Sequence, residues 1–266
     1  MRYNGVALWA GVLLMGMAVT AGCEDNKSEG QSGNELAAKE SIEAYIAAHW
    51  KEYGYRERPV KYIALSFDDG PCASSNSGGT AAMLAALETV KVKATFFVIG
   101  QNVRNNKPAA QAIFDAGHEL GSHSDGYDSL GGRTVEQITA SLDAASLAIR
   151  DITGKDPVLF RAPNLNHGAG LSSVCKDRGM ALIDGSAHND WPGSSAAIKN
   201  SVLDSARDGG IIILHENNTS RGNTLAVLPD IIGGLREKGF WIMTVSELAL
   251  IREKKLEAGV RYGSLN

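Results

Sequence analysis

From residue 61 onward the chain alternates short apolar runs with longer stretches in which apolar residues recur every three or four positions. The short runs have the length and composition of buried β-strands and occur at 62–67, 93–99, 118–122, 158–162, 180–185, 210–215 and 240–245. The longer stretches have the period of amphipathic helices and occur at 80–89, 108–116, 135–152, 171–179, 196–207 and 224–238. The pattern therefore predicts repeated strand–helix units.

Strands that are apolar throughout are typical of parallel sheets, because helices cover both faces of such a sheet. Seven strands within about 190 residues favour a barrel over an open sheet. A complete eight-unit barrel needs roughly 250 residues. We therefore predict an α/β fold, in the form of an irregular, incomplete (β/α) barrel of about seven parallel strands.

The N-terminal segment departs from this pattern. Arg2 is followed by a long apolar run and then by small residues just before Cys23. A basic residue, a short apolar core and a small-residue cleavage site are typical of an export signal, and the cysteine indicates the lipoprotein type. We interpret residues 1–22 as a signal peptide and Cys23 as the lipidated residue. The alternative is a membrane-spanning anchor, for which the apolar run is short.

Residues 23–35 are polar and rich in glycine, and they show no apolar period. This composition predicts a flexible tether. We expect the folded catalytic domain to occupy residues 36–266 and to begin with an amphipathic helix over residues 38–51. The chain is therefore expected to be exported and held at a membrane or cell surface through its lipid anchor only.

The composition is that of an ordinary globular protein, with 44% hydrophobic and 21% charged residues. A net charge of −4 gives no electrostatic footprint for nucleic acid, so we exclude nucleic-acid binding. We also expect the protein to be a monomer. An exported chain permits a disulfide between Cys72 and Cys175. Two separate, small apolar side chains are the equal alternative.

Reactive side chains follow the ends of five predicted strands: Asp68 and Asp69, His123, Arg161, His215, and, a few residues after the fifth strand, Asp190 and Trp191. Parallel α/β barrels place their active sites at the C-terminal ends of the strands. These polar groups therefore converge on one pocket, which predicts an enzyme.

The residue types in this pocket suit hydrolysis. Asp68 and Asp69 are costly neighbours at the end of a buried strand unless a cation or a basic partner lies beside them. One carboxylate and the His123 imidazole suit Zn²⁺ or Co²⁺, which leaves the other carboxylate free to act as a base. Arg161 is placed to orient that base, and His215 lies on another strand end, where it can serve as an acid. The set indicates metal-assisted hydrolysis of an ester or amide.

Five short motifs resemble, in the same order, those of the polysaccharide deacetylases of carbohydrate esterase family four: SFDDGP at 66–71, HSDGY at 123–127, RAPN at 161–164, NDW at 189–191 and ILHE at 213–216. The resemblance covers residues 61–250. It implies an irregular (β/α) barrel, one divalent metal ion and removal of acetyl groups from a polysaccharide.

The resemblance also implies a role for each residue. Asp68 would be the general base that activates water, with Arg161 to orient it, and His215 would be the general acid, with Asp190 to tune its pKa. The other roles are metal binding by Asp69 and His123, stabilisation of the oxyanion by the backbone N–H of Asn164, and a groove for the acetyl methyl group walled by Trp191 and Leu214.

Tyr127 stands where the family usually has a second metal-binding histidine. A phenol with a pKa near 10 is a poor zinc ligand at neutral pH. We therefore expect Tyr127 to line the substrate pocket while water completes the metal shell. Asp125 and Asp128 are the alternative ligands.

Tyr127, RAPN and NDW together are similar to a subset of the family that includes acetylxylan esterases. This similarity favours O-acetyl groups of xylan as the substrate. The first alternative is the N-acetyl groups of chitin oligosaccharides or peptidoglycan. The second belongs to another class of protein, a non-catalytic, lipid-anchored carbohydrate-binding protein.

Overall fold

The computed structural model describes residues 27–73, 79–127, 129–185, 187–188, 190, 194–216 and 222–266. Its strands are β1 (Lys61–Asp68), β2 (Thr95–Val98), β3 (Glu119–Ser122), β4 (Leu159–Phe160), β5 (Ala181–Ile183), β6 (Ala187–His188), β7 (Ile211–His215), β8 (Phe240–Met243) and β9 (Arg261–Tyr262). Its helices are α1 (Lys27–His49), α2 (Gly79–Thr89), α3 (Gly100–Asn105), α4 (Lys107–Asp115), α5 (Val135–Thr153), α6 (Leu171–Asp177), α7 (Ser195–Ser205), α8 (Gly222–Glu237), α9 (Val245–Ile251) and the short 3₁₀ helix η2 (Pro163–Leu165).

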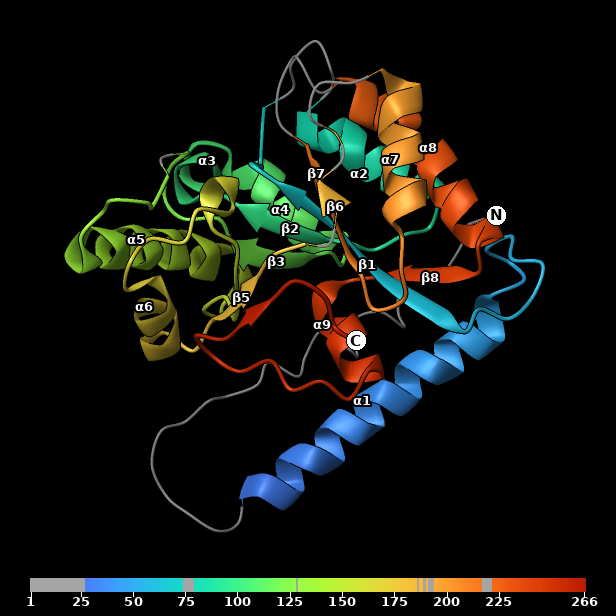
Figure 1. Cartoon of the computed structure of the whole chain (residues 1–266), viewed down its shortest axis with the longest axis horizontal. Coiled ribbons are helices and arrows are strands. Elements are labelled where there is room, and N and C mark those ends of the chain that lie inside the picture. The colour runs from blue at the N-terminus through green and yellow to red at the C-terminus, as the bar shows by residue number, and fades with distance from the viewer. Residues whose placement is uncertain are drawn as a thin grey trace.

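The strands form one sheet in the order β6-β7-β1-β2-β3-β4-β5-β9, and β8 pairs with the first half of β1. The pairings between strands in the described residues are parallel. The sheet curls round without closing fully (Figure 1). An antiparallel bridge between Gly210 and Ser264 joins the start of β7 to the chain that follows β9. The predicted incomplete α/β barrel is confirmed.

Each of the seven predicted apolar runs contains a strand of this sheet. Two further strands, β6 and β9, were not predicted from the sequence. Each has two residues. Two residues make no pattern of their own, and unlike the equally short β4 neither of these strands lies within a longer apolar run.

Side chains of β1 alternate between two environments. Leu65 and Phe67 pack in a core cluster shared with α2, α7 and α8, which lie together on one side of the sheet in Figure 1. Ala64 packs in a second cluster shared with α1 and α9. Ser66 and Asp68 are on the same face of β1 as Ala64, because side chains two positions apart share a face of a strand. This alternation directs Asp68 into the barrel at its C-terminal end.

Helix α1 lies along the outside of the barrel beside α9 (Figure 1). Ile42 and Ile46 are buried in the same cluster as Trp241, which confirms a helix in the region predicted at 38–51. The helix begins at Lys27, however, so residues 27–35 are helical where we predicted a flexible tether. A formed helix extends at little cost, because each added residue gains a hydrogen bond without a new nucleation step.

The proposed signal peptide and Cys23 lie outside the described residues. Within the part of the chain that the structure describes, no helix has both the length and the apolar character needed to cross a bilayer.

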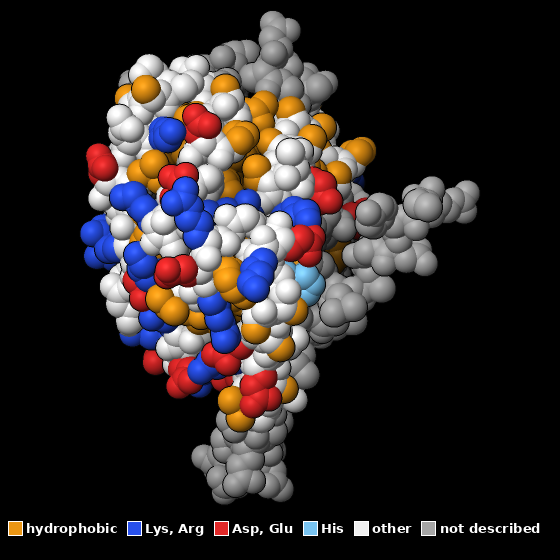
Figure 2. Space-filling view, turned by 90° about the vertical axis from the view of Figure 1, so that its right-hand side faces the viewer, with side chains coloured by type: hydrophobic (Ala, Val, Ile, Leu, Met, Phe, Trp, Pro, Cys, Tyr) orange, Lys and Arg blue, Asp and Glu red, His pale blue; other side chains and the backbone are white. Residues whose placement is uncertain are grey.

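Basic side chains gather at the end of β1 opposite to Asp68 (Figure 2). They line a hollow of about 530 Å³, whose charged residues are Arg56, Glu57, Arg58, Lys61, Arg236, Glu237 and Lys238. Strand β1 has 8 residues, which places this hollow about 23 Å from Asp68 at roughly 3.3 Å per residue. It is therefore separate from the predicted site.

Candidate active site

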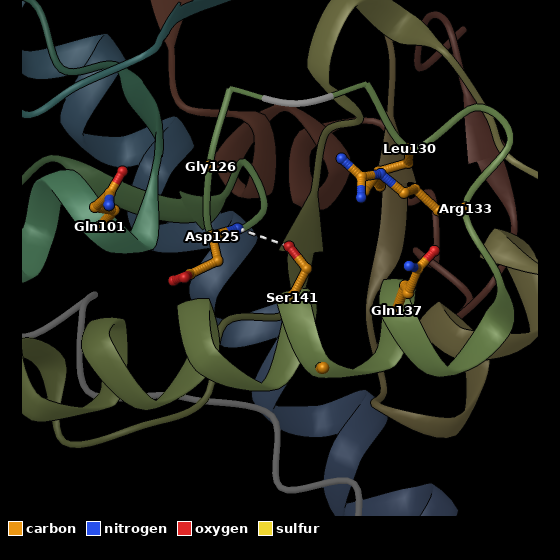
Figure 3. A pocket seen from close by; sticks show the side chains of 8 residues that line it. Gln101, Asp125, Gly126, Leu130, Arg133, Gln137 and Ser141 are labelled. Carbon is orange, nitrogen blue, oxygen red and sulfur yellow. Dashed lines mark hydrogen bonds between the residues drawn. The ribbon is translucent and has the colours of Figure 1, made fainter.

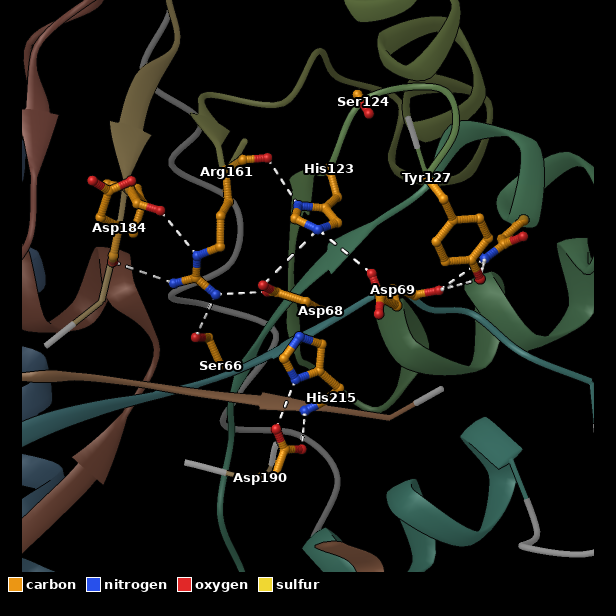
Figure 4. Close-up of polar contacts among 12 residues, drawn as sticks. Ser66, Asp68, Asp69, His123, Ser124, Tyr127, Arg161, Asp184, Asp190 and His215 are labelled. Carbon is orange, nitrogen blue, oxygen red and sulfur yellow. Dashed lines mark hydrogen bonds and ion pairs between the residues drawn. The ribbon is translucent and has the colours of Figure 1, made fainter. Parts of the chain in front are cut away.

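Asp68 and Asp69 both face the ring of His123, although neighbouring side chains on a regular strand point to opposite faces (Figure 4). Strand β1 ends at Asp68, and Asp69 has a φ of 75°. Aspartate tolerates this left-handed conformation better than most residues do. The turn brings Oδ1 of Asp69 to 3.6 Å and Oδ2 of Asp68 to 4.0 Å from Nε2 of His123.

His123 follows β3 and is buried. Its Nδ1–H donates to the carbonyl oxygen of Arg161 at 2.8 Å. This bond fixes the tautomer and leaves the lone pair of Nε2 directed towards the two carboxylates. An imidazole held in this way is ready to bind a metal ion.

Arg161 is fully buried, and it holds Asp68 in place. Its Nη1 donates to Oδ1 of Asp68 at 2.6 Å and to Oγ of Ser66 at 2.8 Å. Its Nε donates to the carbonyl of Ile183 at 2.9 Å, and its guanidinium carbon lies 4.0 Å from the centre of the Phe97 ring. Burial lowers the pKa of Arg161 against the opposing effect of Asp68, but an arginine keeps its proton in proteins. The guanidinium therefore orients one oxygen of Asp68 and leaves the other towards His123.

His215 ends β7 and is bound to Asp190 in two ways. Its Nδ1–H donates to Oδ1 of Asp190 at 2.8 Å, and its backbone N–H donates to Oδ2 at 2.8 Å. Thr224 of α8 also donates its hydroxyl to Oδ2 at 2.9 Å. Burial alone would lower the pKa of His215, but the bond to Asp190 and the charges of Asp68, Asp190 and Asp69 outweigh it and raise that pKa. The raised pKa suits a residue that must carry a proton near neutral pH.

Tyr127 reaches the edge of this site from the loop after β3, and its side chain is half exposed. Its hydroxyl accepts from Nδ2 of Asn102 at 2.9 Å and donates to the carbonyl oxygen of Asp69 at 3.4 Å (Figure 4). Of the two alternative ligands, Asp125 is bound through both oxygens to Arg104, at 2.7 and 2.9 Å. Asp128 lies outside the described residues.

The three other predicted substrate contacts differ in outcome. Asn164 lies in η2, which begins three residues after the end of β4, and is exposed with a φ of 54°. Trp191 lies outside the described residues. Leu214 is completely buried in the core cluster beneath the helices, so the prediction that it walls a substrate groove is wrong. Strand alternation explains the error, because the neighbour of His215 points to the opposite face and Ile213 shares the face of His215.

Both cysteines of the described chain are free thiols, so the disulfide left open by the sequence is not formed. Cys175 is buried in the cluster beside α6, and burial raises the pKa of its thiol to about 12. Cys72 lies near the site, with its Sγ 3.7 Å from the carbonyl oxygen of Glu216.

Glu216, the residue after His215, is buried against Gly70. Its Oε1 accepts from the hydroxyl of Thr80 at 3.1 Å. Burial raises the pKa of its carboxyl group to about 8. Ser66, Asn102, Glu216 and Thr224 also touch the predicted site residues. Ser66 and Glu216 lie within the quoted motifs but were given no role, and Asn102 and Thr224 do not stand out from their neighbours by type or spacing.

The residues present fit a divalent metal ion. Nε2 of His123 and Oδ1 of Asp69 are 3.6 Å apart, close to the separation of two ligands that each lie about 2 Å from one ion. An imidazole nitrogen with a carboxylate oxygen is a donor set that suits Zn²⁺ and Co²⁺. Among the described residues, no group of three or more His, Cys, Asp or Glu side chains comes together as a metal cluster. Asp69 and His123 are thus the two described side chains placed to hold such an ion.

A polar hollow of about 430 Å³ lies beside the loop that follows His123 (Figure 3). Its lining residues are Gln101, Asp125, Gly126, Leu130, Arg133, Gln137, Ala140 and Ser141. Amide, hydroxyl and guanidinium groups of this kind form hydrogen bonds with hydroxyl-rich ligands.

A family model described as polysaccharide deacetylase matches residues 55–183 of the chain. The bifunctional xylanase/deacetylase of Pseudobutyrivibrio xylanivorans is 40% identical over 198 residues, which cover 73% of this chain and 31% of that protein. The peptidoglycan-N-acetylglucosamine deacetylase of Bacillus cereus is 31% identical over 194 residues, which cover 71% of this chain and 88% of that protein. The chain thus spans about a third of the first relative and most of the second.

A solved structure shows the same likeness in three dimensions. The family 4 acetyl xylan esterase from Clostridium thermocellum, in complex with a cobalt ion, superimposes with a TM-score of 0.70 at 31% identity. The match covers 77% of this chain and 98% of that one. The family model, the relatives and the solved structure agree with the residues found at the strand ends. The chain belongs to the polysaccharide deacetylase family of hydrolases.

Proposed function

We propose that the chain removes acetyl groups from a polysaccharide with one divalent metal ion, Zn²⁺ or Co²⁺, and that its substrate is the O-acetyl esters of xylan. One observation carries this proposal. Asp68 and His215 are register partners on the neighbouring strands β1 and β7, and each is held by its own partner of opposite charge. A base and an acid are thus fixed side by side next to Asp69 and His123.

Asp68 takes the proton from the attacking water. Its Oδ1 is occupied by Arg161 at 2.6 Å, so Oδ2, on the side of His123, is the oxygen that accepts the proton. Because Arg161 is itself held at Ser66 and at the carbonyl of Ile183, it holds the base in one orientation. Fixing a reacting group in this way lowers the entropic part of the barrier.

His215 gives its proton to the oxygen that leaves the acetyl group. Its Nδ1–H is bound to Asp190, which leaves Nε2 as the atom that carries the transferable proton. The Asp190 carboxylate stabilises the charged imidazolium before transfer. The backbone N–H of Asn164 is the proposed donor to the oxyanion, and Trp191 is the proposed wall for the acetyl methyl group.

Asp69 and His123 would hold the metal ion, which would polarise the acetyl carbonyl and lower the pKa of the attacking water. The solved relative in complex with a cobalt ion supports the use of a divalent metal ion. Tyr127 would border the substrate, since its ring is half exposed and its hydroxyl is already bound to Asn102.

The xylan substrate is supported by the names of two relatives, a bifunctional xylanase/deacetylase and an acetyl xylan esterase. Hydrolysis of an acetyl ester expels a sugar alkoxide, which is a weaker base than the nitrogen expelled from an N-acetyl group. Departure of the alkoxide therefore depends less on protonation by the acid. The second candidate is N-deacetylation of peptidoglycan, which the Bacillus cereus relative favours.

Release of acetate from acetylated xylan, chitin oligosaccharides and peptidoglycan, measured side by side, tests the substrate. We expect the highest kcat/KM on acetylated xylan. Higher turnover on either N-acetylated polymer would contradict the xylan assignment and leave the deacetylase mechanism standing.

We further propose that the protein is an exported monomer, anchored by a lipid on Cys23. The apolar run and small residues before Cys23 support this location. Labelling of expressing cells with a radioactive fatty acid should mark the wild-type chain and not Cys23→Ser. Equal labelling of both chains would contradict the lipid anchor.

A further inference from the structure

The short helix α3 and the residue before it are hydrogen-bonded to both loops that carry the proposed metal ligands. Towards the loop of Asp69, the backbone N–H of Ile99, just before α3, donates to the carbonyl of Gly70 at 2.9 Å. Towards the loop of His123, the N–H of Gly100 donates to the carbonyl of Ser124 at 3.0 Å. Arg104 of α3 holds this second loop through both oxygens of Asp125. Both ligand loops are therefore fixed to the same helix.

Asn102 is the side chain of α3 that reaches the ligand Asp69. Its Nδ2 donates to the carbonyl oxygen of Asp69 at 2.8 Å and to the hydroxyl of Tyr127 at 2.9 Å. The hydroxyl of Tyr127 in turn points to the same carbonyl, at 3.4 Å. Two side chains from separate segments thus meet at the backbone carbonyl of one ligand (Figure 4).

The backbone of Asp69 needs such support. A φ of 75° is sparsely populated by residues other than glycine, and although aspartate tolerates it better than most, contacts from neighbouring groups help to hold it. This φ turns the Asp69 carboxylate towards His123. A bond to the Asp69 carbonyl therefore acts on the direction of the carboxylate as well as on the turn.

We propose that Asn102 is a positioning residue for the metal ion: by holding the carbonyl of Asp69 it aligns the Asp69 carboxylate with His123 and so sets the affinity of the site. The inference rests on the proposed metal-dependent function. A site to which the described residues offer two ligands depends strongly on this alignment, because the described residues provide no third ligand to compensate when one of the two turns away. Partners that orient metal ligands typically contribute 10- to 100-fold in affinity.

Titration of the metal-free full-length chain with Zn²⁺ and with Co²⁺ tests this role by calorimetry. Asn102→Ala and Asn102→Leu should raise the Kd of each ion by about 10- to 100-fold. The visible absorption of bound Co²⁺ should also change, because the geometry of its ligands changes. Asn105→Ala is the matched control, since Asn105 is an exposed asparagine of the same helix, and its Kd should stay within about 2-fold of the wild type.

Thermal unfolding in the presence of chelator separates positioning from folding. The wild type and both Asn102 variants should remain folded at the temperature of the titration, because Asn102 is only partly buried. If both Asn102 variants fold and bind the ions as tightly as Asn105→Ala, the positioning role is wrong. If the wild type takes up no divalent ion, the proposed metal-dependent function fails, and this inference fails with it.

Tyr127→Phe distinguishes Asn102 from its neighbour. The variant loses the long bond to the Asp69 carbonyl but keeps the Nδ2 bond of Asn102, so its Kd should rise by less than about 3-fold. If Tyr127→Phe raised the Kd as much as Asn102→Ala does, Tyr127 would be the positioning residue, and our assignment would be contradicted.

Discussion

Asp68 and His215 are register partners on the neighbouring parallel strands β1 and β7. Neighbouring strands lie about 4.8 Å apart, so the backbone itself fixes the distance between the proposed base and the proposed acid. Arg161 then holds the first side chain and Asp190 holds the second. The barrel therefore supplies the spacing, and one partner of opposite charge supplies each orientation.

Asp190→Asn should shift the pH dependence of kcat. His215 must be protonated to act as an acid, so activity is lost as the pH rises through its pKa. Asp190 raises that pKa, and asparagine removes the charge while keeping the shape. The descending limb of the profile should move to lower pH, and kcat at pH 8 should fall about 10²-fold. Measurement of kcat from pH 5 to 9 checks this, and an unshifted limb would refute the role of Asp190.

Thr224→Val should disturb the pairing of Asp190 with His215 less than Asp190→Asn does. Valine has the shape of threonine but cannot donate to Oδ2 of Asp190, and a hydrogen bond to a charged group contributes about 1.5 to 3 kcal/mol. The carboxylate keeps both of its bonds from His215. We expect kcat to fall about 10-fold while KM stays unchanged. Steady-state kinetics with Thr89→Val as an exposed control checks this, and equal kcat in the two variants would contradict it.

Arg161→Lys should reduce catalysis although it keeps the charge. Lysine cannot reach Asp68, Ser66 and Ile183 together from one planar group, so Asp68 loses its fixed direction. Misplacement of a reacting group by about 1 Å costs roughly 10²-fold in rate. We expect kcat to fall by about that factor.

Ser66→Ala is the control. It removes one acceptor of the guanidinium, so it should lower the free energy of unfolding by about 1 kcal/mol and change kcat little. If Arg161→Lys were as active as Ser66→Ala, the planar guanidinium of Arg161 would not be needed to orient Asp68.

His118 should make the fold sensitive to acid. It is buried at the start of β3, where its ring accepts from the backbone N–H of Ala94, and burial lowers its pKa from 6.5 to about 3. The unfolded chain therefore binds more protons between these values, and stability falls as the pH drops through this window. The full loss is about 5 kcal/mol at 1.36 kcal/mol per unit of pKa. Urea unfolding at pH 7, 5 and 4 with chelator present should show a smaller loss in His118→Gln. Equal losses would contradict the buried neutral histidine.

The sequence predicted the parts of this structure that depend on regular patterns. Continuous apolar runs marked seven of the strands, and polar residues at the ends of these runs marked Asp68, His123, Arg161 and His215 as neighbours, because parallel strands end at one edge. The sequence pattern also indicated which side chains of β7 face the site. His215 and Ile213 share a face by simple alternation, and the assignment of Leu214 to the groove overlooked this rule.

Other features had no such signal. Asn102 and Thr224 reach the site from helices, and their contacts depend on how α3 and α8 pack against the loops. The φ of 75° at Asp69 turns two adjacent carboxylates to one side, which no spacing rule predicts. The start of α1 at Lys27 follows from extension of a helix through residues that have no apolar period. Tertiary packing and local backbone geometry decide these features.

The central claim is that Asp68 is the base of a metal-assisted deacetylation, and acetate release by Asp68→Asn measures it most directly. Asparagine keeps an oxygen to accept from Arg161 but cannot take a proton, so the variant should fold and bind polysaccharide. We predict a fall in kcat of about 10³-fold on acetylated xylan, within the range for loss of a general base. The wild type treated with chelator should lose activity and regain it with Zn²⁺ or Co²⁺. Full activity in Asp68→Asn would contradict the mechanism.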